Sequence, residues 1–434
     1  MQYLNIIYFI VISLLGVKFL TSKGGIVKSP FDKSTLMKLD GPEMFWCLTF
    51  STGLLAFSVN VGLDLMAIRL LVLELLCIVG LFVCKNKPVM SLPIYVYIAY
   101  LLWLCIGLTY TISPAYGVRV ILKYLYPFLL CLFASAAVRH IEVWMKSALL
   151  ARLVAVLSLL VVFIPYASWL MPGVFWYATA LAINYISIMI FSLALVYFTN
   201  EKKKNLIYTV LFMLPCFLWV FRTSIMGSFV ALMAFYLIKY RLRAAPIIFG
   251  FICLGVVAVF TIPSLKAKMF RQENGDVTIE QFRSGQLTMD DVDTNARQAV
   301  WEELEDRFYH GHELTGSGTG SAQQYMYENN VFNGLKIAHS DFVQMKCDNG
   351  LVGLILYSSI AALVLLHCIL VYWRNRDPKI KLAAIVAGAS MAGVFVTLYS
   401  DNVVNYSMAT LSMPFGFYGM LLGLLKQKQL VRSY

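Results

Sequence analysis

Charged residues are scarce in this chain. Asp, Glu, Lys and Arg make up 13% of its 434 residues, hydrophobic residues make up 60%, and the mean hydropathy is +0.74. Soluble domains carry about 25% charged residues and less apolar material. The composition therefore excludes a soluble globular protein and predicts an integral membrane protein.

The sequence also lacks the period-two alternation of apolar and polar residues that marks outer-membrane barrel strands. Its apolar runs are about twenty residues long, the length that a helix needs to cross the hydrocarbon core. Backbone amides in hydrocarbon must be bonded within their own segment, so helices are expected. We predict an all-α polytopic membrane protein with about 12–13 transmembrane helices. The expected spans lie near residues 3–20, 44–62, 66–84, 92–111, 118–138, 148–170, 174–199, 205–221, 223–239, 244–263, 347–373, 380–399 and 404–425.

Metal-binding spacing is absent among the nine cysteines. Eight lie inside apolar runs and Cys347 lies at the start of another, which is typical of small buried thiols. We therefore predict that all nine are buried, and we expect no cofactor. The eight are Cys47, Cys77, Cys84, Cys105, Cys131, Cys216, Cys253 and Cys368.

Lys and Arg are nearly absent from every second connector between the apolar runs. The other connectors hold twenty-one, whereas these hold only Arg69, Arg119 and Arg222 near their ends. The positive-inside rule places the cation-rich connectors and the C-terminus in the cytoplasm, and the N-terminus outside. In a bacterium this predicts a multi-pass inner-membrane protein. The net charge of +12 arises from these connectors, so we expect contact with membrane lipid and no binding of nucleic acid. The cation-rich connectors are 21–43, 85–87, 139–147, 201–205, 239–243, 374–381 and the C-terminal tail.

One long polar segment interrupts the apolar chain. Between Ser264 and Met345 there are thirteen Asp and Glu against seven Lys and Arg. A connection of this length between spans is usually functional, so we expect the chemistry there. The predicted division is residues 1–263 with about ten transmembrane helices, a large extracytoplasmic loop with short helices over 264–346, the last three transmembrane helices over 347–425, and a cytoplasmic tail over 426–434.

The few outward-facing cations are candidate ligands. Arg222 lies in a minimal hairpin beside Thr223, and ionisable groups at this depth commonly mark substrate paths. Arg119 and Lys123 are one helical turn apart and form a second cationic face. Guanidinium groups match phosphate oxygens bidentately, so these positions predict binding of a lipid-linked diphosphate. The alternative is that such residues snorkel to lipid headgroups, which we expect of Arg69.

Two patterns in the loop carry further candidates. The residues after Arg297 have amphipathic helical spacing, with Trp301 on the same face as Arg297; such a helix can also simply rest on the membrane. Gly318 and Gly320 belong to a glycine-rich turn that can approach a ligand closely or serve as a hinge. No strand precedes this turn, so a dinucleotide-binding or P-loop site is excluded.

His339 stands at the outer end of the next span, with Asp341 two residues on. A histidine there can do acid-base work beside an anionic leaving group, or it can only form an interfacial hydrogen bond. His339 can also hydrogen-bond the diphosphate, and the sequence does not decide between these roles. Asp341 or a glutamate of the loop is the reserve base. The nearby arginines favour the acid-base interpretation.

In this order the motifs resemble the O-antigen polymerase and O-antigen ligase superfamily of polytopic bacterial membrane proteins, over roughly the second half of the chain. The family shows a hairpin arginine next to Ser or Thr, as in Phe221–Ser224, and then a large loop with Arg, three residues and Trp, as in Arg297–Trp301. A Gly-x-Gly-x-Gly stretch follows, as in Gly316–Gly320. A histidine then begins the next span, with Gly-x-x-Gly after it, as in His339 and Gly350–Gly353.

The resemblance implies a GT-C-like glycosyltransferase whose donor is an undecaprenyl-diphosphate-linked oligosaccharide. The leading interpretation is a polymerase of O-antigen, capsule or exopolysaccharide. The alternatives are a ligase that transfers glycan to a lipid core, or a transporter or flippase for lipid-linked sugars. A chain-length regulator and a flippase are expected partners. Arginines can replace a metal beside a diphosphate, so we expect a metal-independent enzyme. The predicted catalytic residues are Arg222, Arg297 and His339; the predicted substrate-binding residues are Arg119, Lys123, Gly318, Gly320, Trp301 and Asp341.

Overall fold

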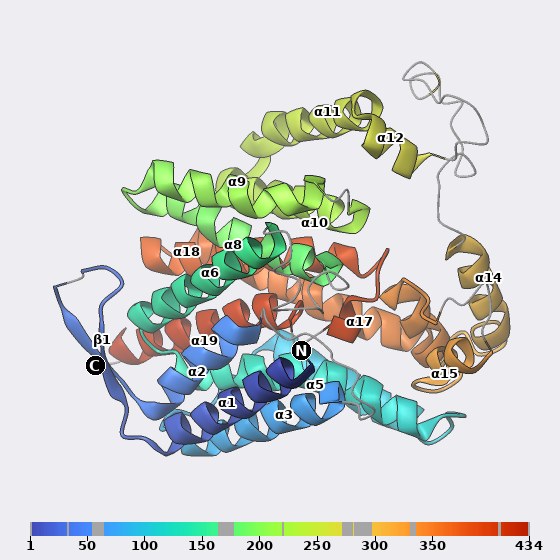
Figure 1. Cartoon of the computed structure of the whole chain (residues 1–434), viewed down its shortest axis with the longest axis horizontal. Helices are drawn as coiled ribbons and strands as arrows, with labels where there is room; N and C mark the ends of the chain where they lie inside the picture. Colours follow the sequence, from blue (N-terminus) through green and yellow to red (C-terminus); the bar gives the residue numbers. More distant parts are fainter. Residues whose placement is uncertain are drawn as a thin grey trace.

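The structure, a computed structural model, describes residues 2–32, 34–53, 65–163, 178–218, 221–270, 281, 297–329, 336–406 and 409–432. Across these residues the chain is almost entirely helical, which confirms the predicted all-α membrane class. The long helices run roughly side by side (Figure 1). They are α1 (Gln2–Thr21), α2 (Gly41–Thr52), α3 (Leu65–Val83), α4 (Leu92–Gly107), α5 (Pro114–Ala137), α6 (Ile141–Phe163), α8 (Ala178–Phe198), α9 (Lys202–Leu218), α10 (Arg222–Tyr240), α11 (Ala245–Thr261), α17 (Asp341–Arg374), α18 (Pro378–Thr397) and α19 (Ser412–Arg432). The short helices are η3 (Arg241–Ala244), α12 (Pro263–Met269), α14 (Arg297–Phe308), α15 (Ser321–Glu328) and η6 (Val403–Tyr406).

Four helical stretches among the described residues are long and apolar enough to cross a membrane, by length and composition. They are Pro114–Ala137, Arg222–Thr261, Asp341–Arg374 and Pro378–Thr397.

Helix boundaries follow local sequence signals. Asp40 and Glu43 form a capping box at α2, in which each side chain accepts the other residue's backbone N–H at 2.9 Å. Pro114 and Pro378 occupy the first turns of α5 and α18, where no N–H is needed. Two boundaries differ from the expected spans. α17 begins at Asp341 rather than near 347, and α19 begins at Ser412 rather than near 404 and continues through most of the expected tail.

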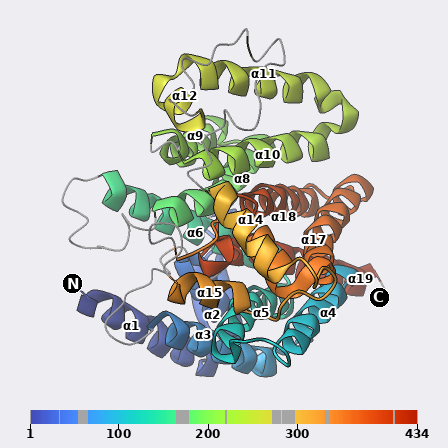
Figure 2. The ribbon, with the colours of Figure 1, turned by 90° about the vertical axis from the view of Figure 1, so that its right-hand side faces the viewer.

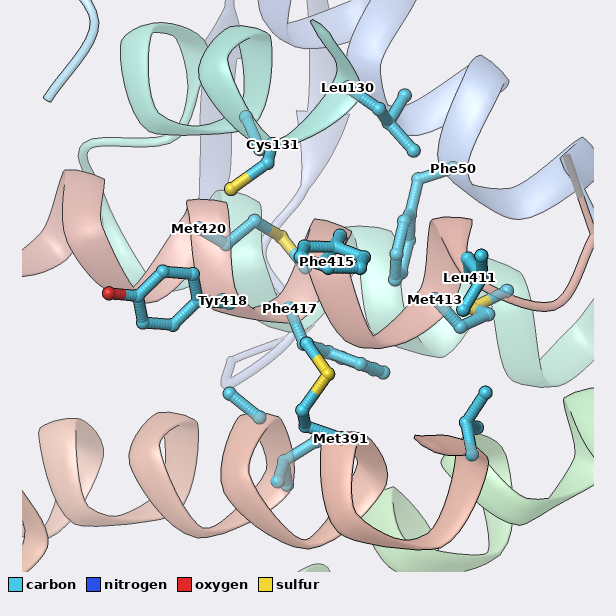
Figure 3. Close-up of a cluster of buried hydrophobic side chains, with 14 of the residues drawn as sticks. Phe50, Leu130, Cys131, Met391, Leu411, Met413, Phe415, Phe417, Tyr418 and Met420 are labelled. Carbon is cyan, nitrogen blue, oxygen red and sulfur yellow. The ribbon is translucent and has the colours of Figure 1, made fainter. Parts of the chain in front are cut away.

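Aromatic side chains pack where α2, α5 and α19 meet. Trp46 stacks on Phe50 with ring centroids 5.1 Å apart, and its indole N–H donates to Met420 Sδ at 3.3 Å. Phe417 meets Phe50 edge-on at 5.1 Å. Figure 3 shows side chains of α19 between those of α5 and Met391 of α18. Helix α19 is therefore buried inside the bundle.

The two ends of the bundle differ. One end carries a hairpin that the sequence did not predict, in which β1 (Gly25–Lys28) pairs antiparallel with β2 (Leu36–Leu39). Figure 1 places this hairpin and the C-terminus at one end, and α14 and α15 at the other. The predicted extracytoplasmic loop and the predicted cytoplasmic tail therefore lie at opposite ends. Which end faces the cytoplasm stays a prediction.

The cysteines are all free thiols, but they are not all buried. The prediction of burial is wrong for Cys105 and Cys253, which are exposed on α4 and α11, and Cys84 is only half-buried. An apolar run predicts a membrane helix, yet a helix that is apolar all round does not reveal which face packs on its neighbours.

Candidate active site

Several helix ends meet at the end of the bundle that carries α14 and α15. α10 begins at Arg222, α17 begins at Asp341 and α18 ends at Thr397. Figure 2 looks onto this end and shows α14 and α15 in front of the helix ends, and both short helices contact α17. Residues far apart in the sequence are therefore neighbours here.

Ser400, in the turn after α18, joins two of the predicted site segments. Its backbone carbonyl accepts a hydrogen bond from Arg297 Nη1 at 2.6 Å. Its hydroxyl lies 3.0 Å from Thr223 Oγ1, and Thr223 directly follows Arg222. The first turn of α10 and the guanidinium of Arg297 are thus held at one turn. A shared anion site there stays a prediction.

His339 precedes α17 in a left-handed backbone conformation, with φ +51°. Such a conformation costs on the order of 1 kcal/mol in a residue other than glycine, and it tends to occur at functional sites. Its Nδ1 lies 3.7 Å from Asp401 Oδ1. That separation is too long for a hydrogen bond, and Nδ1 has no hydrogen-bond partner. It is short enough for an ion pair when the imidazole is protonated.

Trp301 anchors α14 on the bundle. Its indole N–H donates to the Ala338 carbonyl at 2.7 Å, directly before His339. Its ring meets Tyr399 edge-on, with centroids 5.9 Å apart. Trp301 therefore connects α14 to both segments that carry His339 and Ser400. A role in substrate binding stays a prediction.

Asp341 is buried at the start of α17. Its Oδ2 accepts the Val404 backbone N–H at 3.0 Å, and its Oδ1 accepts the Asn402 amide at 3.3 Å. Ser340 caps the same helix start, because its hydroxyl accepts the Val343 N–H at 3.2 Å. The carboxylate thus ties α17 to the segment after α18. Its predicted contact with substrate remains untested.

The two predicted cations of α5 have different surroundings. Lys123 is half-buried, and its ammonium donates to Asn405 Oδ1 at 2.6 Å. Arg119 is exposed, and its guanidinium lies 5.4 Å from the centre of the Tyr116 ring. Lys123 therefore faces the polar interior of this end, whereas Arg119 lies at its surface.

The glycine run packs tightly against the bundle. Gly320 and Ala322 donate backbone N–H groups to the Asp348 carboxylate at 3.0 and 2.8 Å. Gly318 and Gly320 have φ of +97° and +90°. A Cβ at Gly318 would lie 2.5 Å from the Thr111 Cα, and one at Gly320 would lie 2.5 Å from the Gly117 N. The two glycines thus hold the loop against the α4–α5 connection, and their predicted contact with substrate stays a prediction.

The outer surface of the loop is acidic. The Gly311 backbone N–H donates to Glu313 Oε1 at 3.0 Å, and this bond lowers the pKa of Glu313. Glu313 therefore carries negative charge on the exposed part of the loop.

Sequence reasoning missed Ser400, Asp401 and Asn405. The sequence signal is the polar run from Ser400 to Asn402 between two apolar spans, which has the length of an ordinary connector. The run matters because it contacts residues far away in the chain, such as Thr223, Arg297 and His339.

Within the described part of the chain, no three His, Cys, Asp or Glu side chains lie close enough together to hold a metal ion. Metal independence of the reaction stays a prediction.

The comparisons with known proteins cover part of this site. Residues 207–358 match a family model described as O-antigen ligase. Arg222, Arg297, Trp301 and His339 lie inside the matched range, whereas Asp401 lies outside it. No curated protein matches the chain.

Proposed function

We propose that this protein is a polymerase of surface polysaccharide, and the match of residues 207–358 to a family model described as O-antigen ligase supports a role in this chemistry. It transfers glycan from an undecaprenyl-diphosphate-linked donor to a sugar hydroxyl of a second lipid-linked repeat unit. The reaction takes place at the outer face of the bacterial inner membrane. A flippase that delivers the repeat unit and a chain-length regulator are its proposed partners.

The observation that carries the proposal is the meeting of three segments at the turn after α18. Arg297 of α14 and Thr223 of α10 both bond to Ser400, and His339 lies beside Asp401. This arrangement brings the guanidinium of Arg297 and the imidazole of His339 to neighbouring residues of one turn. Such a site suits displacement of an anionic leaving group.

In the proposed reaction, the acceptor hydroxyl oxygen attacks the anomeric carbon of the donor. The bond between that carbon and the diphosphate oxygen breaks, and the diphosphate leaves with the bonding electrons. Negative charge grows on its oxygens, where Arg222 and Arg297 stabilise it. Arginine suits this role because its charge persists at any relevant pH.

The hydroxyl proton needs an acceptor, and we assign that role to His339. With Nδ1 toward Asp401, Nε2 is the nitrogen that receives the proton. The Asp401 carboxylate then stabilises the imidazolium, so Asp401 is a positioning residue.

A ligase that moves finished glycan onto a lipid core is the second candidate, because the matching family is described as O-antigen ligase. The two enzymes share the donor chemistry and differ in the acceptor. To separate the polymerase from the ligase, purified protein is incubated with synthetic polyprenyl-diphosphate repeat units and lipid core. A ladder of products supports the polymerase. Transfer to lipid core without a ladder supports the ligase and contradicts our proposal.

A further inference from the structure

A small polar recess lies beside the proposed active site, where α5, α15, α17 and η6 meet. Its volume is ≈ 10 Å³, which is about the space that one water molecule or one hydroxyl group needs. One wall comes from α15 of the loop and the other walls come from α5, α17 and η6. The recess therefore exists only when α15 is docked on the bundle.

Two carboxyl groups, those of Asp341 and Asp348, line the recess and are both buried. Lys123 is the cation among the lining residues. A space of about one water molecule is too small for a phosphate group. The polar lining equally disfavours a prenyl chain, because buried polar groups need hydrogen-bond partners.

Three amide side chains, those of Gln323, Gln344 and Asn405, also line the recess, and we call them its rim. Gln344 Nε2 donates to Gln323 Oε1 at 3.0 Å, and Lys123 Nζ donates to Asn405 Oδ1 at 2.6 Å. Gln323, Gln344 and Asn405 are half-buried, so they face both the recess and its surroundings. Amide and carboxylate groups of this kind recognise sugar hydroxyls, because they offer donors and acceptors at fixed positions.

The recess is also connected to the proposed base. The Asn402 backbone N–H donates to Asp401 Oδ1 at 2.8 Å. The Asn402 side-chain amide donates to Gln344 Oε1 at 3.1 Å. One residue thus joins the partner of His339 to the rim of the recess, so a group held at the rim has a fixed relation to the base.

We propose that this recess is a subsite for one hydroxyl group of the acceptor sugar. It fixes which acceptor hydroxyl is presented to His339, and so it determines which glycosidic linkage forms. The proposal rests on the proposed function. It adds Gln323, Gln344 and Asn405 as specificity-determining residues.

The test compares Gln323→Met with Gln324→Met, two neighbouring glutamines of α15. Gln323 lines the recess, whereas the Gln324 amide bonds to Glu328 on the same helix. The probe is the repeat oligosaccharide released by mild acid from the lipid-linked unit. Its binding to each purified full-length protein in nanodiscs is measured by saturation-transfer NMR. Rates with the lipid-linked acceptor and its single-deoxy analogues are measured in parallel.

We expect Gln323→Met to weaken oligosaccharide binding and acceptor kcat/KM by roughly two- to tenfold, about the effect of one lost hydrogen bond. For the wild type and for Gln324→Met, one deoxy analogue should react more slowly than the parent acceptor. For Gln323→Met, the same analogue and the parent acceptor should react at similar rates. Equal binding and equal analogue preference in the two variants would overturn the subsite. Gln344→Met should behave like Gln323→Met, and it repeats the test from another helix.

The binding arm separates this subsite from the proposed function. If the wild-type protein makes no ladder but binds the oligosaccharide through Gln323, the subsite proposal is supported and the proposed polymerase function is contradicted. The opposite result is that a ladder forms, while Gln323→Met changes neither the linkage nor the oligosaccharide binding. That result supports the polymerase and contradicts the proposal that the recess is a subsite.

Discussion

Arg297 donates to the Ser400 carbonyl at 2.6 Å, and this bond holds its guanidinium in place before any substrate arrives. Charge that is positioned in advance stabilises a leaving group without reorganisation. Substitution of Arg297 should therefore lower the catalytic rate more than it lowers the stability of the fold.

We expect Arg297→Ala to lower kcat by roughly a hundredfold or more. Arg297→Lys should recover only part of the loss, because an ammonium lacks the planar fork. Initial rates of ladder formation measure the effect. Arg307→Ala is the matched control on α14, since Arg307 is exposed and contacts Tyr325. Full activity of a folded Arg297→Ala protein would instead support a transporter.

Asp401 acts through His339, so its removal should change turnover more than substrate binding. Asp401→Asn preserves the shape but loses the charge that stabilises the imidazolium. We predict a fall in kcat of roughly tenfold to a hundredfold with little change in KM. His339→Gln should lower kcat by at least the same factor. The double variant, with both substitutions, should have nearly the same kcat as His339→Gln alone. Additive losses in the double variant would show that the two residues act separately.

Fixed arginines at the diphosphate should make a metal unnecessary. Purified protein treated with EDTA should therefore keep its ladder-forming activity within about twofold. The activity is measured before and after chelation, and again after Mg²⁺ or Mn²⁺ is added. Loss of activity on chelation with recovery on addition of either ion would contradict metal independence.

At the scale of elements, the docking of α15 depends on the glycine run. Gly318 has φ +97°, and a Cβ there would lie 2.5 Å from the Thr111 Cα. Gly311 also has positive φ, +86°, but a Cβ there would meet nothing within 4 Å. The two positions therefore separate steric clash from backbone strain.

We predict that Gly318→Ala destabilises the docked loop by roughly 2 kcal/mol or more, whereas Gly311→Ala costs about 1 kcal/mol. Limited proteolysis of the loop and thermal melting measure the difference. Because α15 forms one wall of the recess, Gly318→Ala should also weaken acceptor use. Equal protease sensitivity in both variants would show that the clash is relieved by local movement.

At the scale of the whole molecule, the loop and the hairpin occupy opposite ends of the bundle (Figure 1). Ile26 of β1 is 71% exposed, and Gln298 of α14 is exposed as well. If the positive-inside rule holds, these two ends face opposite compartments.

A membrane-impermeant maleimide should label Gln298→Cys from outside the inner membrane. Ile26→Cys should react only after the membrane is permeabilised. Wild-type protein is the control for the native cysteines, including the exposed Cys105 and Cys253. Labelling of Ile26→Cys in sealed cells would reverse the predicted orientation.

The class of fold could be predicted from the amino-acid sequence alone. Long apolar runs fix membrane helices because unpaired backbone amides are too costly in hydrocarbon. The cation bias of the connectors predicts orientation for a similarly general reason. Arg222 is a candidate because charged groups at a membrane boundary commonly mark substrate paths. Arg297 and His339 are candidates because their motifs resemble those of a known family, and the roles of all three stay predictions.

The arrangement of these residues follows from the packing of the whole bundle. The turn at Ser400 and Asp401 looks like an ordinary polar connector in the sequence, and it matters because α10, α14 and the start of α17 converge on it. Burial of individual side chains, as at Cys105, also depends on which helix face meets a neighbour. Contacts between distant segments are set by packing of the whole bundle, which local sequence patterns do not encode.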